Sequence, residues 1–303
     1  MSQTPLRVAI ATATTLPMPD PDEPALVEAL AQRGAEVRVL AWDGASVDAF
    51  AESDLVVVRS TWNYVSRRDA FVAWADAVGA RTELENSART LRDNTDKAYL
   101  LELERAGIPV VPTTMLERGA SAAHALEQVI AVGADVVLKP RIGAGSFATE
   151  RFRLDRSEDV ARARAFLEAH LAERALLAQP FMHHVEDYGE RALVVIDGVL
   201  THAVRKSPRF SGDPPRLSRV AEIADEERAL AARALAFFTE RSQRPPLYAR
   251  VDVVPGGDGS VRVMEIELCE PFLMLGECRE AVERLADATL ARARAARQTR
   301  GSE

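Results

Sequence analysis

The sequence is poor in the residues that build metal clusters and disulfide frameworks. It has two cysteines, Cys269 and Cys278, and five histidines, and no spacing among them resembles a zinc site. No Ser, His and Asp arrangement typical of a hydrolase triad stands out either. We therefore expect two reduced, structural thiols.

Long apolar segments are also missing. The longest apolar runs, residues 55–58 and 192–196, have the length of strands, and residues 1–20 lack the apolar core of a signal peptide. The formal net charge of -8 combines both signs along the whole chain, so no basic surface is expected for nucleic acid or anionic lipid. We expect a cytoplasmic protein with small-molecule partners, no nucleic acid and no membrane, and the sequence leaves homodimer formation open.

Two nucleotide-binding signatures are absent. No Gly-x-Gly-x-x-Gly motif follows the first predicted strand, residues 6–11, which argues against a dinucleotide cofactor. The Walker motif is missing as well, because Lys139 precedes the glycine-rich loop of residues 141–149 instead of following it. Buried strands and helices do alternate up to about residue 78, which predicts an α/β N-terminal domain with a parallel sheet.

The pattern changes in the middle of the chain. The predicted elements are a helix capped by Asn94, a helix at 121–132, a strand at 134–140, a helix at 157–173, a strand at 175–181, two hairpins and a terminal helix at 278–297. This change of pattern marks the end of the first domain. We place domains at residues 1–88, 89–180 and 181–298, with a tail at 299–303.

The second hairpin carries the strongest candidate for a metal site. Symmetric pairing about the loop at 255–260 sets Val254 against Val261, Asp252 against Val263 and Arg250 against Glu265. Asp252, Glu265 and Glu267 then point to one face, where a magnesium ion would relieve their mutual repulsion. The alternative is an ordinary half-buried strand whose glutamates face water.

The first hairpin turns at Asp197 and Gly198, a strong turn signal. Symmetric pairing sets Ile196 against Val199, Arg191 against Val204 and Glu190 against Arg205. Arg191 and Lys206 then become diagonal neighbours on one face and are candidates for phosphate binding. Glu190 and Arg205 are expected to form an ordinary cross-strand ion pair.

Two further lysines are candidates for phosphate binding. Lys139 ends a strand directly before the loop at 141–149, whose small residues leave backbone amides free to approach phosphate oxygens. Lys97 falls in the first turn of the helix capped by Asn94, where a cation opposes the helix dipole unless an anion is nearby. The alternative for Lys139 is a solvated lysine at a sheet edge. The alternative for Lys97 is a structural lysine whose charge is compensated by the adjacent Asp96.

Two other regions are candidates for ligand contacts. The strand at 175–181 leads into a loop where backbone groups can meet an adenine edge and Glu186 can accept hydrogen bonds from ribose. In the first domain, Asp20, Arg59 and Trp62 lie in or beside loops at strand ends, where open sheets bind substrates. Arg59 is equally interpretable as a structural ion-pair partner, and Trp62 as a core side chain.

Taken in order, these motifs resemble the ATP-grasp superfamily. NTDK, VLKP, GAGSFAT, the QPF junction and RVDVV followed by MEIEL occur in that family's order over residues 90–275. VVRSTWNY and HAVRKSP are similar to a bacterial subgroup that contains the cycloserine-forming ligase, with glutathione synthetase and D-alanine ligase as more distant relatives. One departure is Glu267, which stands where the family usually has an asparagine.

The resemblance implies two α+β subdomains that clasp ATP together with Mg2+, for which Mn2+ can substitute. It implies ATP-binding residues at Lys97, Lys139, Gly143, Gly145, Ser146, Gln179, Phe181, Glu186 and Arg191. It implies metal ligands at Asp252, Glu265 and Glu267, and catalytic cations at Lys206, Arg219 and Arg250.

The implied reaction is ATP-dependent ligation of a carboxylate to an amine, on an amino acid or a small peptide. The carboxylate attacks the γ-phosphate to give an acyl phosphate, and the amine then displaces phosphate, leaving an amide and ADP. A ring-closing ligase acting within one molecule is the alternative. A non-catalytic protein that binds or senses ATP is an alternative of another class.

Overall fold

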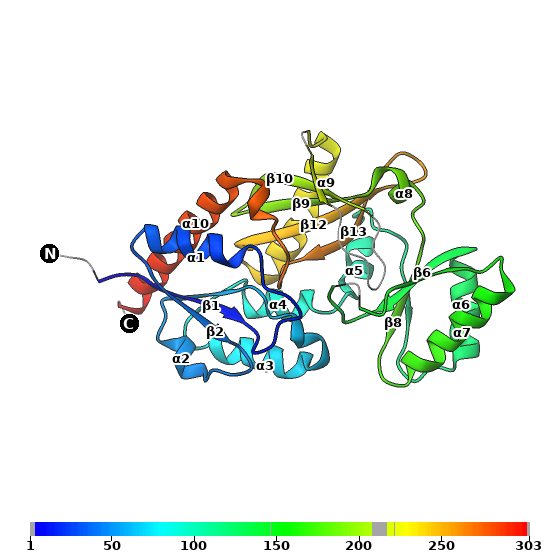
Figure 1. The fold of residues 1–303 in the computed structure, drawn as a ribbon, viewed down its shortest axis with the longest axis horizontal. Helices are drawn as coiled ribbons and strands as arrows, with labels where there is room; N and C mark the ends of the chain where they lie inside the picture. Colours follow the sequence, from blue (N-terminus) through cyan, green and yellow to red (C-terminus); the bar gives the residue numbers. More distant parts are fainter. Residues whose placement is uncertain (1–3, 146, 208–216, 221, 302–303) are drawn as a thin grey trace.

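The computed structural model describes residues 4–145, 147–207, 217–220 and 222–301, which form three sheets (Figure 1). The first has the strand order β2-β1-β3-β4 and contains β1 (Arg7–Thr12), β2 (Glu36–Ala41), β3 (Leu55–Val58) and β4 (Glu83–Glu85). All of its strand pairs are parallel. This confirms the parallel α/β sheet predicted for the N-terminal part of the chain.

Helices cover both faces of the first sheet. On one face, Phe50 of α2 (Val47–Ala51) and Phe71 and Trp74 of α3 (Arg68–Gly79) form an aromatic core. On the other face lie α1 (Glu23–Gln32) and the C-terminal helix α10 (Arg279–Arg300), which pack against each other. The C-terminal helix α10 therefore completes the hydrophobic core of the N-terminal sheet.

The second sheet is antiparallel, with the strand order β5-β8-β6-β7. It contains β5 (Thr114–Leu116), β6 (Asp135–Pro140), β7 (Glu150–Arg153) and β8 (Leu176–Pro180), with α6 (Ala122–Val132) and α7 (Ser157–Leu171) on one face. Val136 and Leu138 are buried under these helices. Because side chains alternate along a strand, Asp135, Val137 and Lys139 lie on the opposite face.

The third sheet is antiparallel, with the strand order β11-β10-β9-β12-β13. It contains β9 (Glu190–Ile196), β10 (Val199–Lys206), β11 (Leu217–Val220), β12 (Tyr248–Pro255) and β13 (Val261–Glu267). Helices α5 (Tyr99–Arg105) and α9 (Asp225–Ser242) cover one face, and α10 covers part of the other. Three shorter helices, α4 (Ala88–Asn94), α8 (His184–Tyr188) and the 3-10 turn Trp62–Ser66, lie between the larger elements.

The hairpin of β12 and β13 differs from its predicted register by two residues. Its first pair is Pro255 with Val261, one residue away from the symmetric arrangement, and a bulge at Met264 adds a second residue. Asp252 therefore lies opposite Glu265, and Arg250 opposite Glu267, in place of the predicted pairs. A shift of two residues leaves every side chain on its original face, so the three carboxylates still share a face with Arg250.

The hairpin of β9 and β10 differs from its predicted register by one residue. Ile196 pairs with Val199 as predicted, but a bulge at Thr201 shifts all later pairs. Arg191 lies opposite Arg205 and Lys206 opposite Glu190. The prediction that Arg191 and Lys206 share a face is therefore wrong, because a shift of one residue exchanges the two faces.

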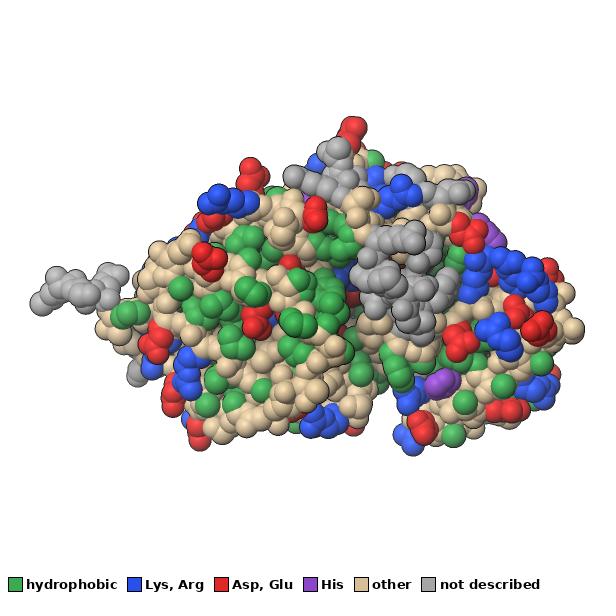
Figure 2. Space-filling view, viewed as in Figure 1, with side chains coloured by type: hydrophobic (Ala, Val, Ile, Leu, Met, Phe, Trp, Pro, Cys, Tyr) green, Lys and Arg blue, Asp and Glu red, His purple; other side chains and the backbone are tan. Residues whose placement is uncertain are grey.

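Charged side chains of both signs are interspersed over the face of the molecule shown in Figure 2. Within the described ranges, no helix is long and apolar enough to cross a membrane. Cys269 and Cys278 are both buried and form no disulfide, as predicted.

Candidate active site

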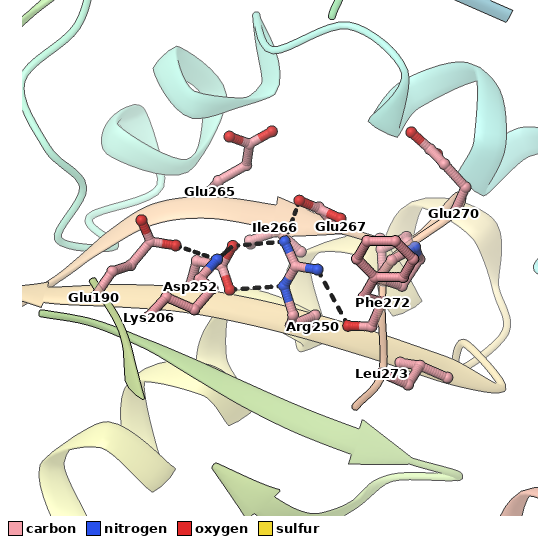
Figure 3. Close-up of polar contacts among 12 residues, drawn as sticks. Glu190, Lys206, Arg250, Asp252, Glu265, Ile266, Glu267, Glu270, Phe272 and Leu273 are labelled. Atoms are coloured by element: carbon pink, nitrogen blue, oxygen red, sulfur yellow. Dashed lines mark hydrogen bonds and ion pairs between the residues drawn. The ribbon is translucent and has the colours of Figure 1, made fainter. Parts of the chain in front are cut away.

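One face of the third sheet changes from apolar to charged along its strands. On β9, Ile196, Val194 and Ala192 belong to the core that includes α10, and the next residue on this face is Glu190. The charged end is completed by Lys206, Arg250, Asp252, Glu265 and Glu267 from three neighbouring strands (Figure 3). The same face thus supplies both a structural core and a polar site.

Arg250 is the centre of the charged cluster. Its Nε and Nη2 atoms donate hydrogen bonds to the two carboxylate oxygens of Asp252, each at 2.9 Å, and Nη2 also pairs with Glu267. Arg250 and Asp252 are 6% and 2% exposed, so water screens their charges little. Burial raises the pKa of Asp252, but Arg250 and Lys206 outweigh burial and hold this pKa well below its usual value.

Glu267 shows the opposite balance. Burial raises its pKa to about 7, and repulsion by Asp252 and Glu265 adds to burial, although Arg250 lowers the pKa. The surroundings of Glu267 therefore hold too little positive charge to keep its carboxylate ionised at its usual pH. A further cation at this position would remove the deficit.

Lys206 links Asp252 to a carboxylate that the sequence did not assign to the site. Its Nζ atom lies 2.7 Å from Asp252 Oδ2 and also pairs with Glu190 (Figure 3). The predicted pair of Glu190 with Arg205 is wrong, because the bulge at Thr201 changes the register. Burial raises the pKa of Glu190 to about 7, against the attraction of Lys206. The sequence signal that could have assigned Glu190 to the site was its position at the charged end of an otherwise apolar strand.

Two lysines hold Glu265 from the other side. Lys97 Nζ lies 3.0 Å and Lys139 Nζ 3.6 Å from its carboxylate oxygens. Lys97 also donates a hydrogen bond of 2.6 Å to the carbonyl of Gly143, in the loop after β6. Burial lowers the pKa of Lys139, and the neighbouring Lys97 lowers it further, against the attraction of Glu265. The structure thus brings together both predicted lysines, one loop glycine and one predicted metal ligand.

Asn94 does not cap a helix, contrary to the prediction. It ends α4, and its buried side chain bonds the carbonyl of Ile266 at 2.8 Å and the N–H of Leu268 at 2.7 Å. Lys97 therefore lies in the connection between α4 and α5 and not in the first turn of a helix. Its position depends on this anchorage of the connection to β13.

The remaining predicted phosphate ligands lie elsewhere or are only partly described. Arg191 is on the opposite face of the sheet, where it pairs with Glu227 of α9 at 2.9 Å. The backbone of Arg219 pairs with Val204, and its side chain lies outside the described atoms, as does Ser146. Gly145 is exposed in the loop, with a positive φ of 62°.

Of the predicted nucleotide contacts at and after the end of β8, Phe181 and Glu186 lie next to Arg151. Gln179 is buried and donates a hydrogen bond to Thr113 Oγ1 at 2.9 Å. The backbone N–H of Phe181 donates to the carbonyl of Asp135 at 2.8 Å, so this N–H is not free to meet an adenine edge. Glu186, on α8, is exposed and lies 2.5 Å from Arg151 Nη1.

Arg59 and Trp62 contact the connection between β13 and α10, which we define as the 270–275 segment, and Asp20 pairs with Arg59. Arg59 is 1% exposed, lies 3.6 Å from Asp20 and donates to the carbonyl of Pro271 at 3.0 Å. Trp62 donates to the carbonyl of Glu270 at 3.0 Å. Arg59 thus has the structural ion-pair role given as its alternative, and its Nε and Nη1 atoms have no hydrogen-bond partner.

The same segment reaches the charged cluster. Arg250 Nη1 donates to the carbonyl of Phe272 at 3.1 Å, and His202 Nε2 lies 2.9 Å from the carbonyl of Leu273. Asp22 accepts hydrogen bonds from the N–H groups of Leu273 and Leu275, at 2.6 and 2.8 Å. The 270–275 segment therefore connects the N-terminal sheet directly to Arg250.

The three predicted metal ligands are held by cations and not by one another. Across the described ranges, no group of three or more His, Cys, Asp or Glu side chains is arranged to hold a metal ion. Asp252 and Glu265 are nevertheless direct cross-strand neighbours on the face they share with Glu267. The donor set consists of hard carboxylate oxygens, which Mg2+ prefers, so the residues fit this ion.

Known proteins with this architecture define its class. The chain has the fold of the ATP-grasp ligase PsnB, whose structure with minimal precursor, Mg and ADP matches with a TM-score of 0.64 at 20% identity, covering 97% of this chain and 100% of PsnB. The predicted fold class, an α/β domain followed by an ATP-grasp fold, is thus confirmed. Together with the relation to D-cycloserine synthetase DcsG described next, this fold makes the chain an ATP-grasp ligase, an enzyme of the class that forms carbon–nitrogen bonds.

A narrower family is also defined. The chain is 34% identical to the cycloserine biosynthesis protein DcsG of Streptomyces lavendulae over 290 residues, which cover 92% of this chain and 96% of DcsG. The crystal structure of D-cycloserine synthetase DcsG matches with a TM-score of 0.86 at 31% identity, covering 95% and 99% of the two chains. The family described as the N-terminal domain of D-cycloserine synthetase DcsG matches residues 8–86. This protein belongs to the DcsG family of ATP-grasp ligases, as the sequence motifs predicted.

Proposed function

We propose that this protein uses Mg2+ and ATP to activate a small-molecule carboxylate as an acyl phosphate, which an amine of the same molecule then attacks to close a ring. ADP and phosphate are released. The observation that carries the proposal is the cluster of carboxylates and cations at the charged end of the third sheet, where Lys139 pairs with Glu265 and Lys206 pairs with Asp252. The relation to DcsG over nearly the whole chain favours ring closure over a linear amide.

Lys97 and Lys139 are the proposed phosphate ligands. Without a nucleotide, both neutralise the partly buried Glu265. The γ-phosphate carries more charge than one carboxylate, so it would draw the lysines away and release Glu265 for the metal.

Asp252, Glu265 and Glu267 would hold the magnesium. The bound ion would supply positive charge to the phosphate oxygens during transfer. Glu267 fits this role because burial and the neighbouring carboxylates raise its pKa to about 7 even though Arg250 pairs with it. Mn2+ also prefers oxygen ligands, so we expect it to support turnover in place of Mg2+.

Arg250 and Lys206 would stabilise the transferred phosphoryl group or the reacting carboxylate. Phosphoryl transfer requires chiefly positioning and positive charge around crowded oxygens, and both side chains are already fixed by Asp252. Arg219 is retained as a third candidate on the basis of the family pattern. On the nucleotide side, we propose Gln179, Phe181 and Glu186 at the adenosine and the loop with Gly143, Gly145 and Ser146 over the phosphates.

The 270–275 segment connects Asp20, Arg59 and Trp62 to the charged cluster. All three contact this segment or its partners, and Phe272 within it bonds Arg250. We propose that they shape the substrate pocket through this segment. We also propose the domain limits 1–88, 89–180 and 181–298, which follow the three sheets.

The decisive experiment is a coupled assay of ADP release with Mg-ATP across amino acids and their amine-bearing derivatives. We expect release with a substrate that has both a carboxylate and an amine, and mass spectrometry should find a product one water lighter than that single substrate. A product that joins two molecules would support the linear alternative. Nucleotide binding without release above background across the panel would contradict the proposal and favour a sensing protein.

A further inference from the structure

Arg151 lies on the same face of the second sheet as the proposed phosphate ligand Lys139. It pairs with Val137 across β6 and β7, and Val137 precedes Lys139 by two residues on the same strand. Paired residues in a sheet point to the same side, so all three side chains share this face. A nucleotide whose phosphates meet Lys139 would extend along β6 toward Arg151.

Three contacts fix the Arg151 guanidinium. Its Nε and Nη2 atoms donate to the two oxygens of Asp135, at 2.9 and 2.6 Å. Its Nη1 atom donates to Glu186 at 2.5 Å, and its Cζ atom lies 3.4 Å from the ring centroid of Phe181. Arg151 thus joins two of the proposed adenosine contacts, and its side chain is only 16% exposed.

The same residues border an open cavity of about 350 Å3. Its lining includes Asp135, Arg151, Arg153, His183 and Glu186. Glu186 is about half exposed within it, so one carboxylate oxygen is held by Arg151 while the group still faces the cavity. A carboxylate held in this way is preorganised to accept hydrogen bonds from hydroxyl groups.

We propose that Arg151 is a nucleotide-positioning residue, which orients Glu186 toward the ribose hydroxyls and presents its guanidinium beside Phe181 to the base. This inference rests on the proposed function, because it takes ATP as the ligand and Glu186 as its ribose contact. Arginine suits the task since a planar guanidinium can bind carboxylates in two directions and stack on a ring at the same time. Lysine offers neither the fork nor the plane.

The test compares equilibrium binding of Mg-ATP and Mg-2′-deoxyATP by calorimetry, which does not depend on turnover. We expect Arg151→Gln to weaken ATP binding about 10-fold, the value of one charge-assisted hydrogen bond. We expect the preference of the wild type for ATP over 2′-deoxyATP to fall toward one in this variant. Arg151→Lys should recover only part of the affinity, because it restores the charge without the fork.

Two further variants separate positioning from a structural role. If Arg151 acts through Glu186, its substitution should have no further effect once Glu186 is already changed. The double variant Arg151→Gln, Glu186→Gln should then show the same preference for ATP over 2′-deoxyATP as Glu186→Gln alone. The matched control is Arg162→Gln, since Arg162 also pairs with two carboxylates, of Asp159 and Glu150, and lies over an aromatic ring, Phe152, but on α7. It should leave both dissociation constants unchanged.

Two outcomes would overturn the inference. One is a preference for ATP over 2′-deoxyATP that survives unchanged in Arg151→Gln, and the other is an equal loss of affinity in Arg162→Gln. Failure of the proposed ligase function would appear separately, as wild-type protein that binds nucleotide but releases no ADP in the turnover assay.

Discussion

Glu85 provides a test of how burial and ion pairing balance in this fold. It ends β4, is 1% exposed and pairs with Arg292 at 2.8 Å and with Arg244. One of its carboxylate oxygens has no hydrogen-bond partner. Burial raises the pKa of Glu85 from 4.5 to about 7, although Arg292 lowers it.

The size of the effect follows from this shift. A displacement from 4.5 to about 7 corresponds to about 3 kcal/mol between the two protonation states. The folded state holds this proton more tightly than the unfolded state, so the unfolded state loses its proton first as the pH rises. Glu85 therefore lowers the free energy of unfolding between about pH 4.5 and 7, and its cost is fully present above pH 7.

Glu85→Gln removes the titration but keeps the shape of the side chain. The quantity to follow is the free energy of unfolding of the variant minus that of the wild type. We expect this difference to rise by about 3 kcal/mol as the pH increases from 4 to 8. Urea unfolding at unit steps of pH measures both proteins, and the comparison cancels other titrating groups, including Glu190 and Glu267. A difference that is constant with pH would refute the reasoning, and a change of opposite sign would show that the arginines outweigh burial.

The other predictions concern the site directly. Asp252→Asn and Glu267→Gln should each reduce ADP release about 1000-fold with an unchanged circular dichroism spectrum, and near wild-type activity would contradict the metal assignment. Lys139→Ala should raise the KM for ATP about 10-fold and affect the fold little, which steady-state kinetics and a melting curve can test. Arg191→Gln should lower the free energy of unfolding by about 3 kcal/mol, because it leaves Glu227 buried and unpaired, while the KM for ATP stays within about 2-fold.

The metal-binding face was predictable although its register was not. The loop offset and the bulge at Met264 each add one residue, and the two together restore the original alternation. At Thr201 a single extra residue exchanged the faces, and Arg191 moved away from Lys206. Sequence symmetry cannot locate a bulge, because a bulge depends on the packing of neighbouring strands.

Helix α9 and the contact made by Asn94 differ in whether the sequence could have revealed them. The predicted elements omitted α9, although Leu230, Ala231, Ala234, Leu235 and Phe238 repeat with helical spacing and three acidic residues occupy its first turn. The role of Asn94, in contrast, could not be predicted from local sequence spacing. Its side chain bonds backbone groups more than 170 residues away in the chain, and a strong helix-capping signal at Asn94 concealed that contact.

The 270–275 segment has a consequence for exchanging parts between relatives. The recognisable N-terminal module is residues 8–86, yet Asp22, Arg59 and Trp62 within it bond backbone groups of a segment more than 200 residues downstream. A chimera that replaces only the module would set foreign side chains against these native carbonyl and amide groups. An active chimera should therefore exchange two parts together, the N-terminal module and the 270–275 segment that it contacts.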